Sequence, residues 1–328
     1  MAIFQVSQSK VKKWRQCRRA YHYRYVEHLK KVIKARPLQF GSIIHRMIDA
    51  DANNECPFEL LDEIAAGQGK LFAAEREMYG ELVEDIRSIM EGYFDYWEDE
   101  PLLFNKIGPR RTEHELEVDL CDGIRLVLVL DGVVRTRNKL RWLLENKTGK
   151  TIQSEDDNWR NLQSAVYLRA CEMLGIKKLT GVLWNFIKSK PPTKPQILKD
   201  GGLSRRKIVT LPSVVLRACE EAGLDPKDYE DLVDSAKMSM GEYYKRVFTP
   251  VQAEVVDQIF GDFVSTAQEI ADKHGKSSER NIGKHCGWCD YESICRAELT
   301  GGDVDFVKER EYETSQREEE VQEDSEED

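Results

Sequence analysis

Residues 124–149 read IRLVLVLDGVVRTRNKLRWLLENKTG, and they predict the centre of the fold. Runs 124–134 and 140–147 are rich in β-branched and aliphatic residues and flank the polar TRNK of 136–139, which predicts an antiparallel hairpin. Just before them, the HELEVDL of 114–120 alternates apolar and acidic residues, as a half-buried strand does. We therefore expect a three-stranded antiparallel meander.

The hairpin brings two carboxylates face to face. If it is centred near Asn138, paired residue numbers sum to 276 and Asp131 faces Glu145. Two acids in direct opposition repel unless a cation lies between them, and oxygen ligands, including the backbone carbonyl of Asn146, suit Mg²⁺ or Mn²⁺. Lys147 shares the face of Glu145 and is placed to orient a water or to stabilise charge on a phosphate oxygen. The alternative is an ordinary edge hairpin with a surface Glu and Lys.

Downstream of the hairpin the pattern alternates between helix and strand. We expect a helix at 159–174, a buried strand at 181–188 and another strand at 207–211, with helices from there to His274. A strand, a crossover helix and a second strand imply a mixed sheet with helices packed against it. The predicted fold class is therefore α/β.

The first 110 residues are predicted to be helical. Ser7 or Ser9 is placed to cap a first helix, a second helix carrying His45 begins near Gly41, and a longer one covers 71–97. Residues at intervals of three or four form one inward stripe of the first helix. The stripe consists of Trp14, Cys17, Tyr21 and Tyr25.

The two ends of the chain carry opposite charge. Residues 303–328 hold 13 acidic and 3 basic residues, which predicts a disordered acidic tail that either competes with DNA or is an inert solubilising segment. The first 46 residues hold 12 Lys or Arg and a single acid, Glu27. Such a face attracts a phosphate backbone, although a solvated helix face gives the same pattern. The candidate DNA contacts are Lys12, Lys13, Arg15 and Arg19.

Three cysteines near the end of the chain predict a metal site. Cys286, Cys289 and Cys295 form C-x2-C-x5-C and need a fourth ligand, for which Cys17 on the inward stripe is the best candidate. Four thiolates hold either Zn²⁺ or an iron-sulfur cluster, and their spacing does not separate the two. An ordered loop without a metal is the alternative. This pairing would tie the N-terminus to the C-terminal cysteines.

Several short motifs occur in an order that resembles the RecB-like nucleases of the PD-(D/E)XK superfamily, especially the iron-sulfur group that includes the AddB nuclease and the CRISPR-associated exonucleases. They cover residues from about 5 to 297. The motifs are W-x2-C-R-x2-Y (Trp14, Cys17, Arg18, Tyr21), G-S-x-x-H (Gly41, Ser42, His45), Asp131-Gly132, E-N-K-T-G (Glu145 to Gly149), Q-x3-Y (Gln163, Tyr167) and the terminal cysteines. The residue after Glu145, often aromatic or apolar in this family, is Asn146 here.

The resemblance implies a restriction-endonuclease-like core and a set of roles. Divalent-metal ligands would be His45, Asp131, Glu145 and the Asn146 carbonyl, with Lys147 catalytic. Gln163 and Tyr167 would help to position the substrate. Cys17, Cys286, Cys289 and Cys295 would hold a [4Fe-4S] cluster.

We expect a Mg²⁺- or Mn²⁺-dependent DNA exonuclease acting on single-stranded DNA or linear ends. One alternative is a non-catalytic or partner-dependent DNA-binding subunit that acts with a helicase, an integration complex or another recombination partner. Another is a zinc-stapled interaction protein. No apolar run approaches the roughly 20 residues that span a bilayer, and the N-terminus lacks a signal-peptide pattern. The expected location is the cytoplasm, or that of the host if a phage encodes the chain.

We expect one nuclease domain over 1–302. It would comprise a helical part (1–110), a catalytic α/β core (111–212) and a helical, cysteine-rich part (213–302), followed by the disordered tail (303–328).

Overall fold

The computed structural model describes residues 3–33, 35–67, 73–107, 110–151, 155–176 and 178–314. Its central sheet has five strands in the order β3-β6-β7-β8-β9. β7 and β8 are parallel and joined through helix α6 (Leu162–Met173), whereas the other neighbours are antiparallel. The mixed α/β fold is thus confirmed. The strands are β3 (Leu103–Phe104), β6 (Gly132–Arg135), β7 (Arg141–Gly149), β8 (Leu179–Lys188) and β9 (Tyr244–Pro250).

A second sheet has the order β1-β5-β4 and divides the predicted meander. Its strands are β1 (Phe4–Val6), β4 (His114–Cys121) and β5 (Ile124–Leu130). β5 pairs with β4, but the chain leaves this sheet at Asp131, and β6 pairs with β7. A side chain at Gly132 would meet the ring of Phe104 at 3.3 Å, so the exit from β5 is close-packed. The hairpin register is confirmed, because Gly132 lies opposite Leu144.

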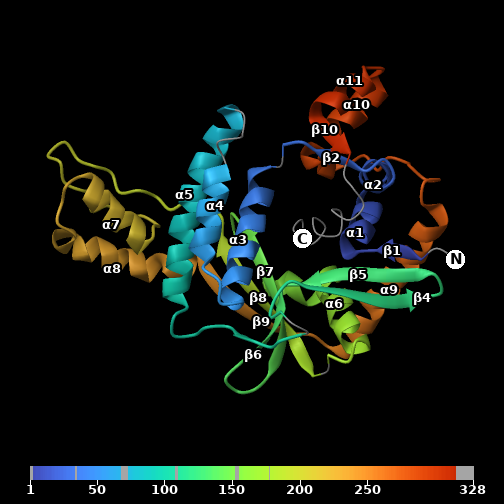
Figure 1. Cartoon of the computed structure of the whole chain (residues 1–328), viewed down its shortest axis with the longest axis horizontal. Helices are drawn as coiled ribbons and strands as arrows, with labels where there is room; N and C mark the ends of the chain where they lie inside the picture. The colour runs from blue at the N-terminus through green and yellow to red at the C-terminus, as the bar shows by residue number, and fades with distance from the viewer. Residues whose placement is uncertain are drawn as a thin grey trace.

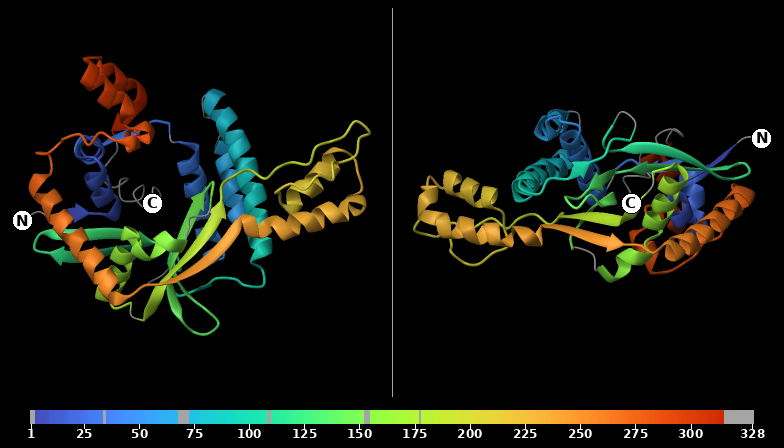
Figure 2. Two further views of the ribbon diagram at one scale, coloured as in Figure 1. Left: turned by 180° about the vertical axis from the view of Figure 1, so that it is seen from behind. Right: turned by 90° about the horizontal axis from the view of Figure 1, so that it is seen from below.

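Helices pack on both faces of the central sheet (Figure 1, Figure 2). On one face, α6 and α9 (Ala253–Lys273) share a core with β5 and with α1 (Gln8–Gln16) and α2 (Arg18–Tyr25). On the other face lie α3 (Arg36–Ala52), α4 (Pro57–Gly67) and α5 (Ala73–Tyr96), which enclose a second core. The sheet therefore separates two apolar layers, and its polar residues have to lie at the boundary between them.

The prediction of a strand at 207–211 is wrong. The edge of the sheet is instead β9, which pairs with β8 along its whole length. Leu211 is buried in the core beside α5 and directly precedes α7, so this apolar run packs as a connection rather than as a ladder. The sequence did not predict β9, because polar side chains such as Lys245 and Arg246 interrupt its apolar pattern.

The predicted first helix is interrupted at Cys17. Ser7 caps α1 as predicted, accepting a hydrogen bond from the Lys10 amide, but Cys17 is extended (φ −163°, ψ 115°) and α2 starts after it. Trp14 and Tyr21 still contact each other in the core. Cys17 leaves that stripe and packs with Cys289 and Cys295.

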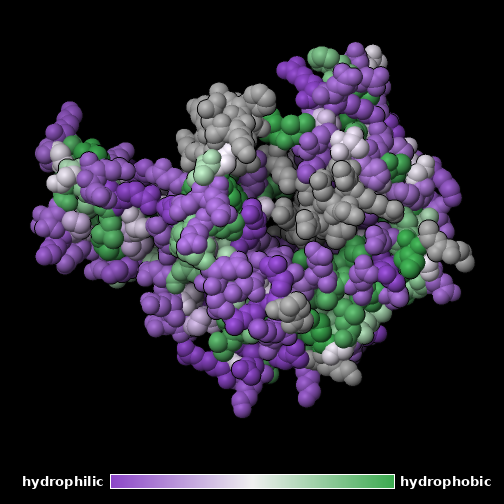
Figure 3. Space-filling view, in the orientation of Figure 1, coloured by the Kyte–Doolittle hydropathy of each residue, from purple (hydrophilic) through white to green (hydrophobic). Residues whose placement is uncertain are grey.

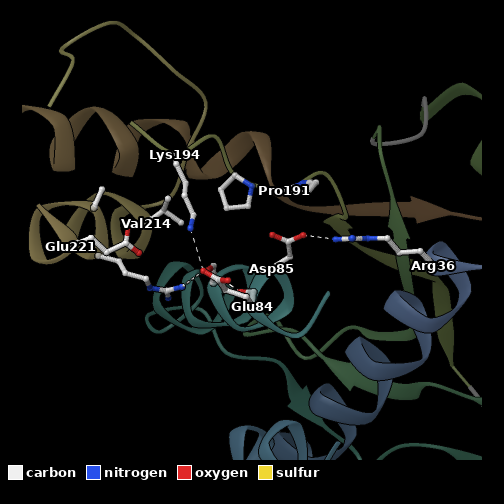
Figure 4. A pocket seen from close by; sticks show the side chains of 11 residues that line it. Arg36, Glu84, Asp85, Pro191, Lys194, Val214 and Glu221 are labelled. Carbon is white, nitrogen blue, oxygen red and sulfur yellow. Dashed lines mark hydrogen bonds and ion pairs between the residues drawn. The ribbon is translucent and has the colours of Figure 1, made fainter. Parts of the chain in front are cut away.

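An arm projects from the side of α5 (Figure 1). It contains α7 (Pro212–Glu221) and α8 (Glu230–Ser239) around a small core of its own. A cavity of about 360 Å³ lies between the arm and α5 (Figure 4). Its charges are paired across it: Lys194 and Arg217 reach Glu84 at 3.3 and 3.5 Å, and Arg36 binds Asp85. The two pairs with Glu84 connect the arm to α5, whereas the Arg36–Asp85 pair joins α3 to α5 within the body.

The C-terminal segment is ordered further than predicted. After α10 (Glu292–Thr300), α11 (Val304–Glu311) and β10 (Tyr312–Thr314) follow, and β10 pairs with β2 (Leu29–Lys31). The expected disorder from 303 is therefore wrong up to Thr314, because the ladder and the buried Tyr312 outweigh the local acidity. Residues 315–328 lie outside the described part. The chain also has 3-10 turns at Glu155–Arg160, Pro226–Tyr229, Met240–Glu242 and Lys284–Trp288.

Hydrophilic side chains dominate the face shown in Figure 3. None of the helices within the described residues is long and apolar enough to cross a membrane.

Candidate active site

Three side chains from distant parts of the chain converge beside the start of β6. His45 comes from the middle of α3, Asp131 from the link between β5 and β6, and Glu113 from the residue before β4. The Nδ1 atom of His45 lies 3.5 Å from Oδ1 of Asp131 and 4.0 Å from Oε1 of Glu113. One ligand atom of each lies within 4.8 Å of the other two, which is close enough to hold one metal ion.

The electrostatics of this group favour a positive charge at its centre. Burial lowers the pKa of His45, but the carboxylates of Asp131 and Glu113 outweigh that effect and raise it to about 9. Burial also raises the pKa of Asp131, yet His45 and the amide of Asn146 hold it below its usual range. A buried carboxylate kept ionised in this way needs a cation beside it, and a divalent metal supplies one as well as an imidazolium does.

A second polar group lies on the face of β7 that is covered by α6. Glu145 is buried, and its Oε1 accepts a hydrogen bond from Nε2 of Gln163 at 2.8 Å. Lys147 Nζ lies 3.2 Å from the same oxygen and donates to Oε1 of Gln163 at 3.0 Å. The Glu-x-Lys pair therefore points to one side, as the two-residue period predicts, and Gln163 joins its members.

The two polar groups meet through the backbone of β7. The Asn146 amide donates a hydrogen bond to Oδ2 of Asp131. The pairing of Gly132 with Leu144 places Asp131 and Glu145 at the next position of the same register. Within the described residues, the carboxylate of Glu145 is not part of the three-residue group around His45. Its Oε1 is instead engaged by Gln163 and Lys147.

The remaining predicted substrate contacts fall into different environments. Tyr167 is buried in the core one turn after Gln163. Lys12 is exposed and Lys13 half-buried. Arg15 binds the Asp262 carbonyl at 2.7 Å and the Thr266 hydroxyl at 2.8 Å.

Arg19 pairs with Glu298 and lies over the ring of Tyr23 at 4.7 Å. It is therefore engaged within the protein, as Arg15 is. The five aromatic residues that follow Lys10 in the basic segment do not form a surface for stacking bases, because these five are buried. They are Trp14, Tyr21, Tyr23, Tyr25 and Phe40.

The four predicted cluster ligands line one cavity of about 240 Å³ between α2 and α10. They are Cys17, Cys286, Cys289 and Cys295. Three of the sulfur atoms are within reach of N–H donors from residues 280–283. Arg280 Nε lies 3.3 Å from the sulfur of Cys295, and two backbone amides in this segment lie 3.5 Å from the sulfurs of Cys17 and Cys286.

The spacing of these thiols bears on the kind of metal. A tetrahedral zinc site with Zn–S bonds of about 2.3 Å brings its sulfurs within about 4 Å of one another. Among the described residues no three cysteine sulfurs lie within 4.8 Å of one another. As placed, the thiols therefore do not form a compact tetrahedral set, and hydrogen bonds to sulfur are a feature of iron-sulfur sites.

Glu113 is the site residue that sequence reasoning missed. It has a positive φ of 49°, unusual for a residue other than glycine, and the turn directs it toward His45 and Asp131. Two further acids, Glu115 and Glu117, follow it on β4 and made it look like part of an ordinary polar strand face. No local spacing relates Glu113 to His45, which lies on α3.

Comparison with known proteins agrees with this geometry. The model of the family described as the PD-(D/E)XK nuclease superfamily matches residues 5–296. No curated protein matches the chain at a significant level.

Proposed function

The chain belongs to the PD-(D/E)XK nuclease superfamily, and from that premise we propose that it is a Mg²⁺- or Mn²⁺-dependent DNA exonuclease of the RecB-like group. The observation that carries the proposal is the convergence of His45, Glu113 and Asp131 beside the Glu145–Lys147–Gln163 group. An imidazole with buried carboxylates is a donor set that Mg²⁺ and Mn²⁺ accept.

In this proposal His45, Asp131, Glu145 and the Asn146 carbonyl hold the metal, and Glu113 adds a further carboxylate. The bound ion supplies water activation and screens the scissile phosphate. Lys147 holds its ammonium group toward the same place and stabilises the charge that develops on a phosphate oxygen during hydrolysis. Its position is restrained, because Nζ contacts both Glu145 and Gln163.

Gln163 positions the substrate indirectly by holding those two side chains in one arrangement. The buried Tyr167 supports the helix that carries Gln163. DNA approaches along the basic N-terminal segment, where Lys12 and Lys13 are the proposed phosphate contacts. Arg15 and Arg19, which bind protein groups, shape that segment.

We propose a structural [4Fe-4S] cluster held by Cys17, Cys286, Cys289 and Cys295. Support comes from the shared cavity and from the N–H donors directed at three sulfurs. Such a cluster joins the break between α1 and α2 to the C-terminal helices. Its thiolate bonds would stabilise the termini against the nuclease core. A colourless preparation that contains zinc would show that the four cysteines hold Zn²⁺ and not an iron-sulfur cluster. The proposed nuclease site would be unaffected.

The test is incubation of anaerobically purified protein with end-labelled single- and double-stranded DNA in Mg²⁺, Mn²⁺ or chelator. We expect metal-dependent shortening from an end, which Glu145→Ala and Lys147→Ala abolish. Glu117→Ala is the matched control, since Glu117 is exposed on β4 and its carboxylate forms an ion pair with Arg125 on the neighbouring strand. DNA binding without cleavage in any metal would favour the non-catalytic, partner-dependent alternative, and internal cuts in circular DNA would replace exonuclease by endonuclease activity.

A further inference from the structure

Three polar residues form a row across the back of the catalytic strand. Asn146 on β7 lies opposite Asn185 on β8, which lies opposite Arg246 on β9. Asn185 Nδ2 donates to Oδ1 of Asn146 at 2.8 Å and to the hydroxyl of Tyr93, on α5, at 2.9 Å. The row therefore connects three strands with the helix that covers them.

The far end of the row is fixed to the last turn of α5 and the residues after it. Arg246 Nη2 donates to the hydroxyl of Tyr93 at 3.3 Å, and Nη1 donates to the carbonyl of Glu100. Its guanidinium lies over the ring of Trp97, 3.9 Å from the centroid. Arg246 has few ways to move, and through Tyr93 it restrains Asn185.

The row lies in a place where apolar residues would be more stable. Asn146 and Asn185 are 3% and 0% exposed, and around them lie the apolar side chains of the layer enclosed by α3, α4 and α5. Within the described residues, Oδ1 of Asn185 has no hydrogen-bond partner. A buried polar atom without a partner costs stability, so the row is not explained by stability alone.

Asn146 is the residue through which the row reaches the active site. Side chains alternate along β7, so the side chain of Asn146 points away from the face that carries Glu145 and Lys147. Its backbone amide, however, donates to Asp131. Fixing the side chain of Asn146 from behind thus fixes the peptide that binds Asp131 and lies between Glu145 and Lys147.

The register gives a second reason for a specific polar pair here. A slip of one residue between β7 and β8 would turn Glu145 and Lys147 to the wrong face. Apolar side chains on neighbouring strands tolerate such a slip, whereas two paired amides at directly opposed positions do not.

We propose that Asn185, held by Tyr93 and Arg246, is a positioning residue for the metal site, acting through Asn146. The proposal rests on the proposed function, because it assumes that Asp131 and its neighbours bind a divalent metal. In this proposal, residues on the opposite face of the sheet orient the peptide at Asn146. Metal affinity then depends on Asn185, Tyr93 and Arg246, which are not themselves proposed ligands.

The experiment compares Mn²⁺ binding by calorimetry with thermal unfolding for the full-length protein. The variants are Asn185→Leu, Asn146→Leu, their double variant and Tyr93→Phe. Loss of an orienting partner typically costs about 10–100-fold in metal affinity, so Asn185→Leu should raise the Mn²⁺ dissociation constant by about that factor. Tyr93→Phe should have a smaller effect in the same direction, because the bond between the two amides remains.

The double variant separates positioning from packing. Replacing both amides by apolar groups can be nearly neutral for stability, so its melting temperature should return toward that of the wild type while its Mn²⁺ affinity stays low. Tyr243→Phe is the matched control. Tyr243 is buried in the same layer, but its hydroxyl donates to the carbonyl of Val209, so Tyr243→Phe should leave Mn²⁺ binding unchanged.

The outcomes distinguish failure of the positioning role from failure of the proposed metal site. If the wild type binds Mn²⁺ and all Asn variants bind it equally well, the positioning role is wrong and the metal site stands. If the wild type binds no Mn²⁺, the metal site and the inference that rests on it both fail. If Asn185→Leu does not fold, Tyr93→Phe decides, since unchanged Mn²⁺ affinity in that variant contradicts the role of the row.

Discussion

The side-chain amide of Gln163 donates to the carboxylate of Glu145 across 2.8 Å. The same amide accepts from Lys147 at 3.0 Å through its oxygen. A single neutral side chain from α6 therefore holds an acid and a base of β7 at fixed positions. Replacing Gln163 removes these two hydrogen bonds but leaves both partners of the Glu145–Lys147 ion pair at 3.2 Å, so the function of Gln163 can be tested separately from theirs.

Gln163→Leu should lower the rate of DNA cleavage by about 10–100-fold with little change in DNA affinity, since it removes an orienting partner and no phosphate contact. Single-turnover cleavage and binding of uncleavable DNA in Ca²⁺ measure the two quantities. Gln268→Leu on α9 serves as the control, because the Gln268 amide is exposed and donates to the sulfur of Cys121. Equal losses in rate and in DNA affinity would instead make Gln163 a substrate contact.

Glu113→Gln should weaken Mn²⁺ binding by about 10-fold or more, because it removes one of the carboxylates within ligand distance of His45 and Asp131. The exposed Glu115→Gln, two residues along the chain, should bind Mn²⁺ normally. Calorimetric titration with Mn²⁺ measures both variants. A Glu113 variant with wild-type affinity would restrict the metal site to the ligands predicted from the sequence.

Local patterns predicted the parts of the site that are close in sequence. The hairpin register follows from alternation and a polar turn, and it placed Asp131 opposite Glu145 before any tertiary contact was known. Glu113 was not predictable in this way, because it reaches His45 only after α3 has packed against the sheet. A positive φ at Glu113 leaves no trace in composition.

The fold was predictable to a similar extent. The crossover from β7 through α6 to β8 follows from periodicity, whereas β9 does not, since Lys245 and Arg246 break its apolar pattern. The break at Cys17 lies inside a regular helical stripe, and at this break Cys17 packs against the same apolar cluster as Cys289 and Cys295. The position of Tyr312 depends on a ladder with β2, in which it pairs with Lys31 near the start of the chain.

Cys17→Ala should lower the iron content and the melting temperature of anaerobically purified protein, because Cys17 is the one proposed ligand that comes from the N-terminal half. Cys56→Ala is the control, since Cys56 is exposed and is not among the described residues that line the cavity. Iron is measured chemically and by the visible absorption of the cluster. Unchanged iron in Cys17→Ala would show that another group supplies the fourth bond.

Glu298 should make stability depend on pH. Burial raises its pKa, but the guanidinium groups of Arg19 and Arg280, which bind its carboxylate, outweigh this and lower it below the ordinary value of 4.5. A carboxylate with a depressed folded-state pKa stabilises the protein above its unfolded pKa, and that stability is lost as the pH falls through the folded-state pKa. Glu298→Gln should therefore cost about 1–3 kcal/mol at pH 7 and progressively less below about pH 4.

Denaturant unfolding from pH 3 to pH 7 measures this difference. Glu292→Gln is the matched control on the same helix, because Glu292 forms a more exposed ion pair with Arg296. Its cost should be below about 1 kcal/mol at every pH. A Glu298 variant whose cost does not change with pH would mean that the hydrogen bonds, and not the charge, carry the effect.

The acidic segment is best tested by ending the chain after Thr314. Residues 315–328 hold 8 acidic and 1 basic residue, so their removal takes away a net charge of −7, and we predict that this charge competes with DNA phosphates. The shortened chain should bind DNA more tightly at low salt, with the difference shrinking as salt screens it. Fluorescence anisotropy across a salt series measures this. A chain ended at Gly302 would also lose β10, and with it the buried Tyr312, so it should melt at a lower temperature and cannot serve as the test. An affinity gain that persists at high salt would point to steric blocking in place of charge competition.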